Sequence, residues 1–444
     1  MSEGDIVNDN ARKLSRTKRE IWRLRNSASF RIGLHLTKSI RNPLRIILLP
    51  VTFPIFCFYL GLERLGKVAK PKLTAIKHSN LEGDKPENGD GLTSCENCIV
   101  LFPTNGVGFG HFTRLYAVAK KLRLNDPTLE IIFFTPMPTL HIPYSEGFPT
   151  YHLAGKYKHT NMKASTWNML VEEMLTLVFE VHKPKWFVFD GAFPYRGMLD
   201  AINQKPSIKK IWLRRGMFKK RSSVPVDSID FFDSIIHPED AIEMTPVEKI
   251  HSTRTENVSP ITLIEYDEML SRRETRSRLG LPIDCRVTYV QLGAGRINEI
   301  DSDIRIVVNS LLKQKDMYVI IGESMLGKRI NIDLERVRVI RDYPNAIYLK
   351  GIDYCVQAGG YNSFHEMRNM RLPTLFIPNT NTGMDDQLAR CEVASKEGWG
   401  IVLETVNSKN IDGALSEIYK LQSEPNFGSN GADEIAKLIV GGIL

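Results

Sequence analysis

Short apolar runs alternate with longer amphipathic stretches from about residue 99 to the end of the chain. Residues 99–102 and 131–134 are two such runs, and between them Leu115, Val118 and Leu122 recur at helical spacing. A short apolar run bounded by turn residues is typical of a strand buried on both faces of a sheet. Strands that alternate with helices in this way predict a parallel sheet covered by helices, an α/β fold.

The pattern occurs twice, which predicts two Rossmann-like domains facing across a cleft. The first set of strands is expected at residues 99–102, 131–134, 186–189 and 211–213, and the second at 287–292, 318–322, 352–355 and 374–378. We therefore predict an N-terminal domain at residues 96–258, a C-terminal domain at 259–444 and a hinge at 258–260. Ligands of such sheets bind beyond the carboxyl ends of the strands.

The N-terminal 76 residues have a different composition. Residues 1–72 hold fifteen Lys and Arg against five Asp and Glu, whereas the remaining 44 basic and 46 acidic residues nearly cancel. The apolar run at 46–60 is shorter than the ~20 residues that a spanning helix needs, and Pro50 and Pro54 interrupt it. We predict a basic, amphipathic arm at 1–76 that lies in or dips into an anionic membrane surface. The alternative is an element packed on the protein's own body.

Residues 77–95 are rich in Gly, Asp, Asn and Pro and are predicted to be a linker. The near-neutral charge of the rest of the chain argues against a nucleic-acid partner. Cys95 and Cys98 form a Cys-x-x-Cys pair, but no second pair with zinc spacing follows. Asp301-Ser302-Asp303 spells a metal-binding Asp-x-Asp, yet it precedes a helical pattern, and Asp301 or Ser302 is expected to cap that helix. We predict no metal and no cofactor.

The first candidate site is a glycine-rich loop that ends in a histidine. Gly106, Gly108 and Gly110 let the backbone approach a ligand closely, and His111 follows at the expected start of a helix. A neutral histidine at the mouth of a cleft can take a proton from a hydroxyl nucleophile. The alternative is a tight turn with a capping histidine. A dinucleotide site is disfavoured because no acidic residue closes the second strand.

The second candidate site is a glycine pair that opens a helix. Gly359 and Gly360 would hold a diphosphate on free backbone N–H groups, and Asn362 and Ser363 would add donors. Glu366 would accept hydrogen bonds from ribose. Asp386 and Gln387 would hold the sugar. The backbone N–H groups of the loop at Gly293 and Gly295 would give further hydrogen bonds to the diphosphate. The alternative is a helix cap with an exposed glutamate.

Charged residues also stand at strand ends of the first domain. Asp190 could bind or deprotonate an acceptor, as a substitute for His111. Acceptor or phosphate contacts are assigned to Arg114, Arg196, Arg214 and Arg215. An internal ion pair between Asp190 and Arg214 or Arg215 is the alternative.

Together these features resemble a GT-B glycosyltransferase of the MurG-like type, over roughly residues 96–444. Gly106 to His111, Gly359 to Glu366 and the segment at 385–387 carry the resemblance, and residues 25–33 and 41–45 resemble the leading segment of some bacterial surface-polysaccharide glycosyltransferases. Two features depart from MurG itself. The first loop reads Gly-x-Gly-x-Gly-His, with Phe109 narrowing it, and Ala358 to Asn362 replace the polar turn.

The resemblance implies inverting, metal-independent transfer of a sugar from a UDP-sugar, possibly a UDP-N-acetylhexosamine, to a lipid-linked or surface-polysaccharide acceptor. The protein would then be cytoplasmic and attached peripherally to the inner face of the cell membrane. Gly110-His111-Phe112-Thr113-Arg114 also resembles nucleotide-sugar hydrolases of the same fold, so a hydrolase or epimerase is the second hypothesis. A non-catalytic, membrane-docked assembly factor is the third.

Overall fold

The computed structural model describes residues 27–65, 97–104, 108–155, 162–215, 226–242, 253–293, 300–325, 329–381 and 385–443. The chain divides into two compact units, Met1–Gly91 and Leu92–Leu444, and each is considered by itself. The predicted linker at 77–95 and residues 1–26 of the predicted arm lie outside the described residues.

The first half of the larger unit is built on a seven-stranded parallel sheet among the described residues, in the order β3-β2-β1-β4-β5-β6-β7. Its strands are β1 (Cys98–Pro103), β2 (Glu130–Thr135), β3 (Thr150–His152), β4 (Trp186–Asp190), β5 (Lys209–Leu213), β6 (Ser234–Pro238) and β7 (Arg254–Val258). Its helices are α4 (Gly110–Asn125), α5 (His141–Ser145), α6 (Ala164–His182), α7 (Arg196–Asn203) and the 3-10 helix η2 (Val226–Phe231).

The second half repeats the arrangement with a six-stranded parallel sheet among the described residues, in the order β10-β9-β8-β11-β12-β13. Its strands are β8 (Arg286–Gln291), β9 (Met317–Gly322), β10 (Val337–Ile340), β11 (Tyr354–Gln357), β12 (Thr374–Phe376) and β13 (Gly400–Val402). Its helices are α8 (Arg272–Arg278), α9 (Asp301–Leu311), η3 (Asn345–Gly351), α10 (Tyr361–Met370), α11 (Gln387–Lys396), α12 (Ser408–Ile418) and α13 (Gly431–Val440).

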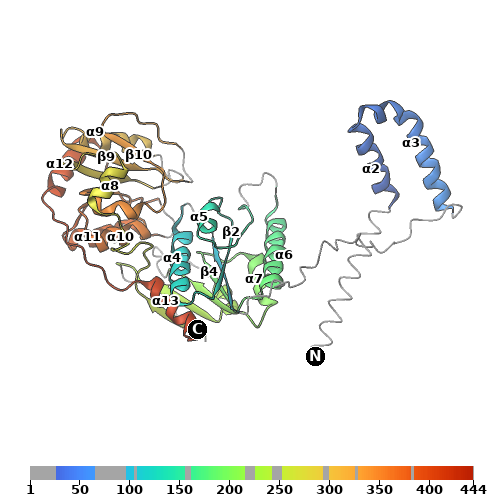
Figure 1. Cartoon of the computed structure of the whole chain (residues 1–444), viewed down its shortest axis with the longest axis horizontal. Helices are drawn as coiled ribbons and strands as arrows, with labels where there is room; N and C mark the ends of the chain where they lie inside the picture. Colours follow the sequence, from blue (N-terminus) through green and yellow to red (C-terminus); the bar gives the residue numbers. More distant parts are fainter. Residues whose placement is uncertain are drawn as a thin grey trace, which may run out of the picture. The chain divides into compact units, whose positions relative to one another are not determined.

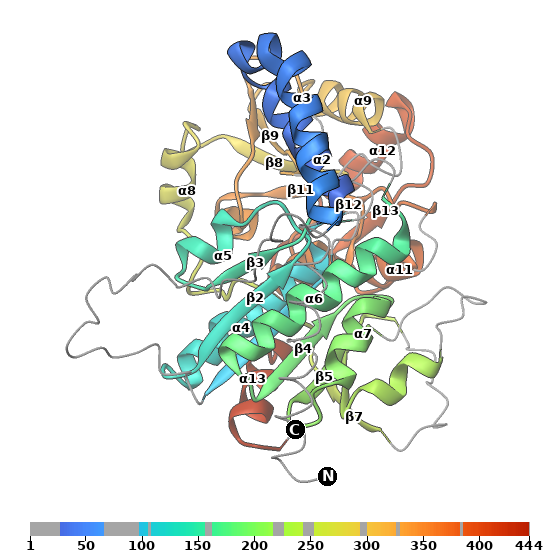
Figure 2. The same cartoon turned by 90° about the vertical axis from the view of Figure 1, so that its right-hand side faces the viewer.

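Helices cover both faces of each sheet, which confirms the predicted α/β class. In the first half α4 and α13 lie on one face and α6 and α7 on the other (Figures 1 and 2). Successive side chains of β1 point to opposite faces of the sheet. Ile99 and Leu101 pack in the core under α4, and Val100 and Phe102 pack in the core under α6. This two-sided burial explains why the strands are apolar throughout.

The C-terminal helix α13 joins the two halves. It follows the second sheet in sequence but lies beside α4 of the first half (Figure 1). Ile435 and Ile439 are buried in the same apolar core as Leu115 and Leu122 of α4. The last helix therefore fixes the two halves to each other by apolar burial.

One strand boundary differs from the prediction. Residues 352–355 read as a strand, but β11 begins two residues later, at Tyr354, and runs to Gln357. Asp353 lies just before the strand. Its carboxylate accepts a hydrogen bond from the N–H of Val287 at 2.8 Å and pairs with Arg276 at 2.8 Å. It therefore caps the start of the neighbouring strand.

The smaller unit is a helical hairpin of α2 (Ala28–Ile40) and α3 (Pro43–Arg64). Arg31 Nη1 lies 2.6 Å from Glu63 Oε2, and the ring of His35 stacks on Phe56 with centroids 4.7 Å apart. These contacts join the start of α2 to the end of α3, so the helices are antiparallel.

The sequence pattern suggested that Pro50 and Pro54 interrupt this apolar run, but neither proline ends the helix. Helix α3 runs for 22 residues through Pro50 and Pro54. Each proline removes only one intrahelical hydrogen bond, and contacts with α2 support the helix along its length. Within α3, the segment Arg45–Glu63 has 19 residues and a mean hydropathy of 1.9, and is long and apolar enough to cross a membrane.

Candidate active site

The candidate site lies where the strand order of each sheet reverses. This point falls between β1 and β4 in the first sheet and between β8 and β11 in the second, and ligands of doubly wound sheets bind beside it. Strand β4 ends at Asp190, and Gly293 and Gly359 follow β8 and β11 closely. A cavity of about 630 Å³ is lined by these three residues and by His111, so the two halves share one cleft.

Asp190 is the buried centre of the first half of the cleft. Its Oδ1 lies 2.7 Å from Nδ1 of His111. Arg114 donates from Nε to Oδ2 at 2.9 Å and from Nη2 to Oδ1 at 2.7 Å, which is a bidentate pair. Burial by itself would raise the pKa of Asp190, but Arg114 and His111 hold that pKa below its ordinary value. The carboxylate is therefore ionised at neutral pH.

The ionised carboxylate determines the state of His111. Nδ1 lies 2.7 Å from the carboxylate, which can only accept, and 2.9 Å from Nη2 of Arg114, which can only donate. The shorter contact favours the proton on Nδ1, and this tautomer leaves the lone pair on Nε2. Burial lowers the pKa of His111, Asp190 opposes that effect, and the charges of Arg114 and Arg215 add to it. A neutral imidazole with a free Nε2 can serve as a base at pH 7.

The second half supplies a helix start with closely packed glycines. Gly359 has φ +79°, and a Cβ there would lie 2.2 Å from Cys391 Sγ, so a side chain would be strained and would clash. Gly360 is the N-cap of α10. The first N–H groups of this ten-residue helix have no intrahelical acceptor, and the helix dipole favours an anion beside them.

A fully buried arginine holds this turn against the first half. Arg390 donates to the carbonyl of Gly359 at 2.9 Å and, from Nε and Nη2, to both oxygens of Asp240 at 2.8 and 2.7 Å. Asp240 follows β6 of the first half, and both side chains are almost completely buried. The two halves are therefore joined by a bidentate ion pair directly beneath the glycine turn.

Asp385 extends this cluster into the cavity. Its Oδ1 accepts from Arg390 at 2.7 Å and from Arg215 of the first half at 3.2 Å. Burial raises the pKa of Asp385, but the two arginines overcome that effect and bring it to about 2. Arg215 also lies over the ring of Tyr361, 5.0 Å from its centroid. Asp385 thus orients Arg215 at the wall of the cleft.

Glu366 is a half-buried carboxyl group, and among the residues that the structure describes no cation lowers its pKa. It lines the cavity on the second turn of α10. Burial raises the pKa of Glu366 to about 7, and no other cause contributes. A carboxyl group in this state is half ionised at neutral pH, so a ligand that donates hydrogen bonds to it will favour the ionised form.

Aromatic contacts bridge the halves on the other side of the cleft. Phe109 stacks on Tyr343 of the second half, with centroids 5.1 Å apart, and the hydroxyls of Tyr343 and Thr113 are 2.9 Å apart. Asn362 donates from Nδ2 to the carbonyl of Gly110 at 3.3 Å. The two predicted glycine turns therefore touch each other directly.

Comparison with known proteins gives distant relatives. No family model matches the chain. It is 24% identical over 182 residues to UDP-N-acetylglucosamine–N-acetylmuramyl-(pentapeptide) pyrophosphoryl-undecaprenol N-acetylglucosamine transferase of Aquifex aeolicus, covering 38% of this chain and 52% of the relative. It is also 24% identical over 192 residues to an uncharacterized glycosyltransferase of Methanopyrus kandleri, covering 41% and 53%. The chain spans about half the length of these curated relatives.

Solved structures match over more of the chain. The glycosyltransferase of kitacinnamycin gives a TM-score of 0.54 at 14% identity, covering 78% of this chain and 99% of that one. MnaA of S. aureus, in a co-structure with UDP, gives 0.54 at 12% identity, covering 78% and 97%. The chain has the GT-B fold. UDP-GlcNAc 2-epimerase of Methanocaldococcus jannaschii, with a TM-score of 0.52 at 14% identity and coverage of 78% and 100%, is another structural neighbour.

The GT-B cleft brings most of the predicted site residues together. The lining residues among them are His111, Asp190, Gly108, Gly110, Arg114, Arg214, Arg215, Gly293, Gly359, Gly360, Asn362, Ser363, Glu366 and Gln387. Gly106 and Gly295 lie outside the described residues. Asp190 forms its ion pair with Arg114, whereas the alternative considered from the sequence was a pair with Arg214 or Arg215.

Two predicted residues are placed elsewhere in the GT-B structure. Asp386 caps α11, accepting from the N–H of Ala389 at 3.1 Å, and does not line the described cavity. Arg196 is exposed at the start of α7, where it pairs with Asp200. The sequence analysis missed Asp240, Arg390 and Tyr343, which have no motif. In the sequence, Arg390 looks like any charged residue on the surface of a helix. Its burial, which only the structure shows, marks it as part of the site.

Replacing Arg390 by methionine leaves the buried Asp240 without its arginine but with His365, whose Nε2 is 3.4 Å away, and releases the Gly359 carbonyl. We expect the free energy of unfolding to fall by about 3–5 kcal/mol, the range for removal of one partner from a buried ion pair. Chemical denaturation followed by circular dichroism measures the loss.

Arg286→Met is the matched control. Arg286 makes the same bidentate contact with Asp316, both bonds at 2.7 Å, but on the surface of the second half. Its loss should cost at most about 1 kcal/mol. Equal losses of unfolding free energy in the two variants would show that the buried pair of Arg390 and Asp240 stabilises the fold no more than a surface ion pair does.

Proposed function

We propose that the protein is a glycosyltransferase that moves a sugar from a UDP-sugar to a hydroxyl acceptor with inversion. One observation carries the proposal: a neutral histidine oriented by Asp190 and a helix start suited to an anion open onto the same cavity. The first pair suits the activation of a hydroxyl group, and the second suits a departing diphosphate.

The reaction would be a single displacement at the anomeric carbon. The acceptor oxygen attacks this carbon while its proton passes to Nε2 of His111, and the bond from the carbon to the diphosphate oxygen breaks. Asp190 stabilises the imidazolium that forms, because its carboxylate already accepts from Nδ1. Asp190 is therefore the orienting partner of the base, and it is too closely held by Arg114 to act as a substitute for it.

When its bond to the sugar breaks, the diphosphate gains one further negative charge, which fixed hydrogen-bond donors can stabilise. The first N–H groups of α10 and the guanidinium of Arg215 line the cavity from opposite halves. Such preorganised donors need no rearrangement when the bond breaks. We propose that they take the place of a metal ion, and that the carboxylate of Glu366 accepts from the ribose hydroxyls.

The names of similar proteins support a UDP-sugar as donor. The relative from Aquifex aeolicus is named as a UDP-N-acetylglucosamine-dependent transferase that acts on a lipid-linked acceptor, and MnaA was solved with UDP. A lipid-linked or polymeric glycan is the acceptor class we propose for this chain. The epimerase neighbour keeps nucleotide-sugar epimerisation or hydrolysis as the second candidate.

Replacing His111 by alanine should remove the base and leave donor binding intact. We expect kcat to fall by about 10²–10⁴-fold, the usual contribution of a general base, with the dissociation constant of the UDP-sugar changed less than threefold. Release of UDP in the presence of acceptor measures kcat, and calorimetry measures binding. His141→Gln, on the exposed start of α5, is the control histidine and should retain full turnover.

The same assay separates the alternatives. Acceptor-dependent release of UDP supports transfer, whereas conversion of the UDP-sugar without any acceptor supports an epimerase or hydrolase. If no nucleotide sugar raises the melting temperature of the wild type, the non-catalytic assembly factor is the better account. Unchanged kcat in His111→Ala would reject the base assignment.

Donor affinity should depend on pH through Glu366. The pKa of this carboxyl group is about 7 in the free protein, and hydroxyl donors favour the ionised form. Below pH 7 a proton must leave before the donor binds, so affinity should rise from pH 6 to pH 8 and then level off. Calorimetric titration with an intact UDP-sugar measures this, because the terminal phosphate of UDP itself titrates near pH 6.

Glu366→Gln should flatten this pH profile, since an amide does not ionise. His111→Ala should leave the profile unchanged, because the imidazole is not part of the proposed donor contacts. A profile that stays steep in Glu366→Gln would remove the ribose assignment from this residue.

We also propose that the hairpin of α2 and α3 holds the enzyme on the inner face of the cell membrane. Ile47, Val51, Ile55 and Phe58 are each more than 60% exposed and recur at spacings of four and three along one face of α3. Charged residues occupy both ends of the hairpin, with Arg31 and Glu63 at one end and Arg41 and Arg45 near the turn.

Burying either end in hydrocarbon would cost about 2.5–3.5 kcal/mol per charge. This cost favours a hairpin that lies in the interface with its apolar face toward the acyl chains, where anionic headgroups attract the basic arm.

Deleting residues 1–72 should abolish binding to vesicles that contain anionic lipid, and Ile47→Asp with Ile55→Asp should weaken it about tenfold or more. Vesicle flotation measures both effects. Leu124→Asp, on an exposed apolar residue of α4, is the control and should bind normally. Release of the wild type by alkaline carbonate supports a hairpin in the interface, and resistance supports a helix that spans. Unchanged binding after the deletion would overturn the role of the arm.

A further inference from the structure

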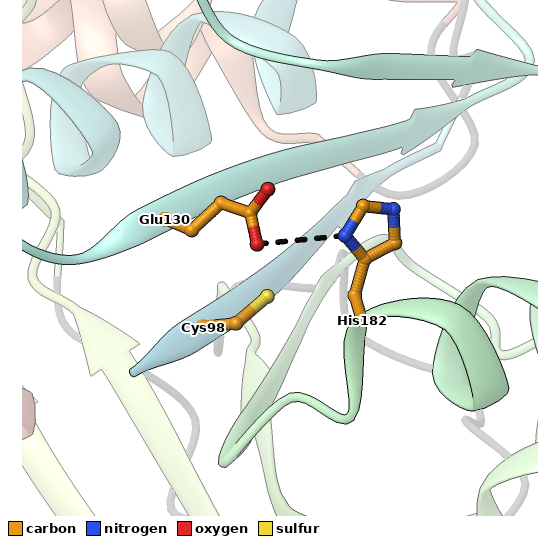
Figure 3. A group of neighbouring side chains, drawn as sticks. All are labelled: Cys98, Glu130 and His182. Atoms are coloured by element: carbon orange, nitrogen blue, oxygen red, sulfur yellow. Dashed lines mark ion pairs between the residues drawn. The ribbon is translucent and has the colours of Figure 1, made fainter. Parts of the chain in front are cut away.

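Three metal-ligating side chains meet at the amino end of the first sheet, away from the cleft. Cys98 begins β1, Glu130 begins β2 and His182 ends α6. One ligand atom from each lies within 4.8 Å of the other two. Figure 3 shows the thiol, the carboxylate and the imidazole pointing toward one another from three separate elements. We propose that this group binds one zinc ion.

The backbone holds the three residues in place independently of any metal. Cys98 and Glu130 are paired neighbours in the parallel register of β1 and β2. Helix α6 ends at Lys183 in a left-handed conformation with φ +48°, and Lys185 then donates its N–H to the carbonyl of Cys98 at 2.8 Å. This return brings His182 next to the starts of both strands.

The donor set and its partners fit zinc. Thiolate, imidazole and carboxylate are the ligands zinc takes, and three protein ligands leave a fourth position for water. Zn–S and Zn–N bonds of about 2.3 and 2.0 Å place tetrahedral ligand atoms ~3.5 Å apart. His182 Nδ1 and Glu130 Oε2 are already 3.4 Å apart, and the thiol, within 4.8 Å of both, would move closer by no more than about 1.3 Å.

The second nitrogen of His182 has a partner of the kind that ligating histidines use. Nε2 lies 2.8 Å from the hydroxyl of Tyr151 on β3. If Nε2 carries the proton and donates it to that oxygen, Nδ1 presents its lone pair to Glu130 and Cys98. An outer partner of this type fixes both the tautomer and the ring orientation of a metal-bound histidine.

The position of the group indicates a structural role. The cavity lies beyond the carboxyl ends of the strands, whereas Cys98 and Glu130 stand at their amino ends, and none of the three residues lines the described cavity. An ion here would tie together the starts of two strands and the end of the helix before β4. The proposal is therefore independent of the proposed transferase activity.

Zinc and cobalt binding to the full, untagged chain test the proposal. After dialysis against chelator, we expect one zinc ion per chain by calorimetry and a rise in melting temperature of about 2–5 °C when zinc is in excess. Cobalt(II) should give a thiolate-to-metal charge-transfer band together with the intense visible bands of tetrahedral coordination.

Cys98→Ser should remove the charge-transfer band, and His182→Gln and Glu130→Gln should each weaken metal binding at least tenfold. Cys57→Ser in α3 and His141→Gln in α5 are the controls, and both should bind one ion normally. Glu130→Gln changes only a partly exposed group, so it keeps the test valid if Cys98→Ser fails to fold. Absence of stoichiometric binding by the wild type, or unchanged binding in Glu130→Gln and His182→Gln, would establish an ion pair beside a buried thiol and overturn the site.

Discussion

The ion pair between Asp240 and Arg390 joins the two halves of the molecule at the base of the cleft. Both groups are almost fully removed from water, so each charge depends on the other and on the hydrogen bonds around it. Arg390 also donates hydrogen bonds to the Gly359 carbonyl and to Asp385, and Asp385 in turn accepts a hydrogen bond from Arg215. These contacts fix the position of the glycine turn at Gly359 relative to the first half of the protein.

Charge in the cleft is arranged in two different ways. In the first half, the bidentate contact with Arg114 helps to keep the Asp190 carboxylate ionised, and burial lowers the pKa of the His111 imidazole. In the second half, none of the described residues supplies such a partner to Glu366, and burial raises its pKa to about 7. The first arrangement fixes a protonation state, and the second makes the state depend on the ligand. A base needs the former, and a binding group that responds to hydroxyl donors can have the latter.

Local pattern was sufficient for much of the fold. The β1 and β8 strands, the α4 and α10 helices and both glycine turns follow from short apolar runs, helical spacing and paired glycines, because these effects act within a few residues. Local pattern gave wrong boundaries where contacts between residues distant in the sequence determine the backbone conformation. Asp353 leaves its strand because Val287 N–H and Arg276 attract it, and α3 continues through two prolines that a local rule would take as breaks.

The sequence alone determined the doubly repeated α/β order, the glycine turns at the strand ends, the basic N-terminal arm and the choice of His111 and Glu366, since each depends on residues close together in the chain. Only the tertiary structure decided that Asp190 is the direct partner of both His111 and Arg114, that Asp386 is a cap, and that Arg390 joins the halves. It alone assembled Cys98, Glu130 and His182. Apart from the local cap at Asp386, these contacts connect residues 32 to 150 positions apart, and burial and charge pairing across such separations leave no periodic trace in the sequence.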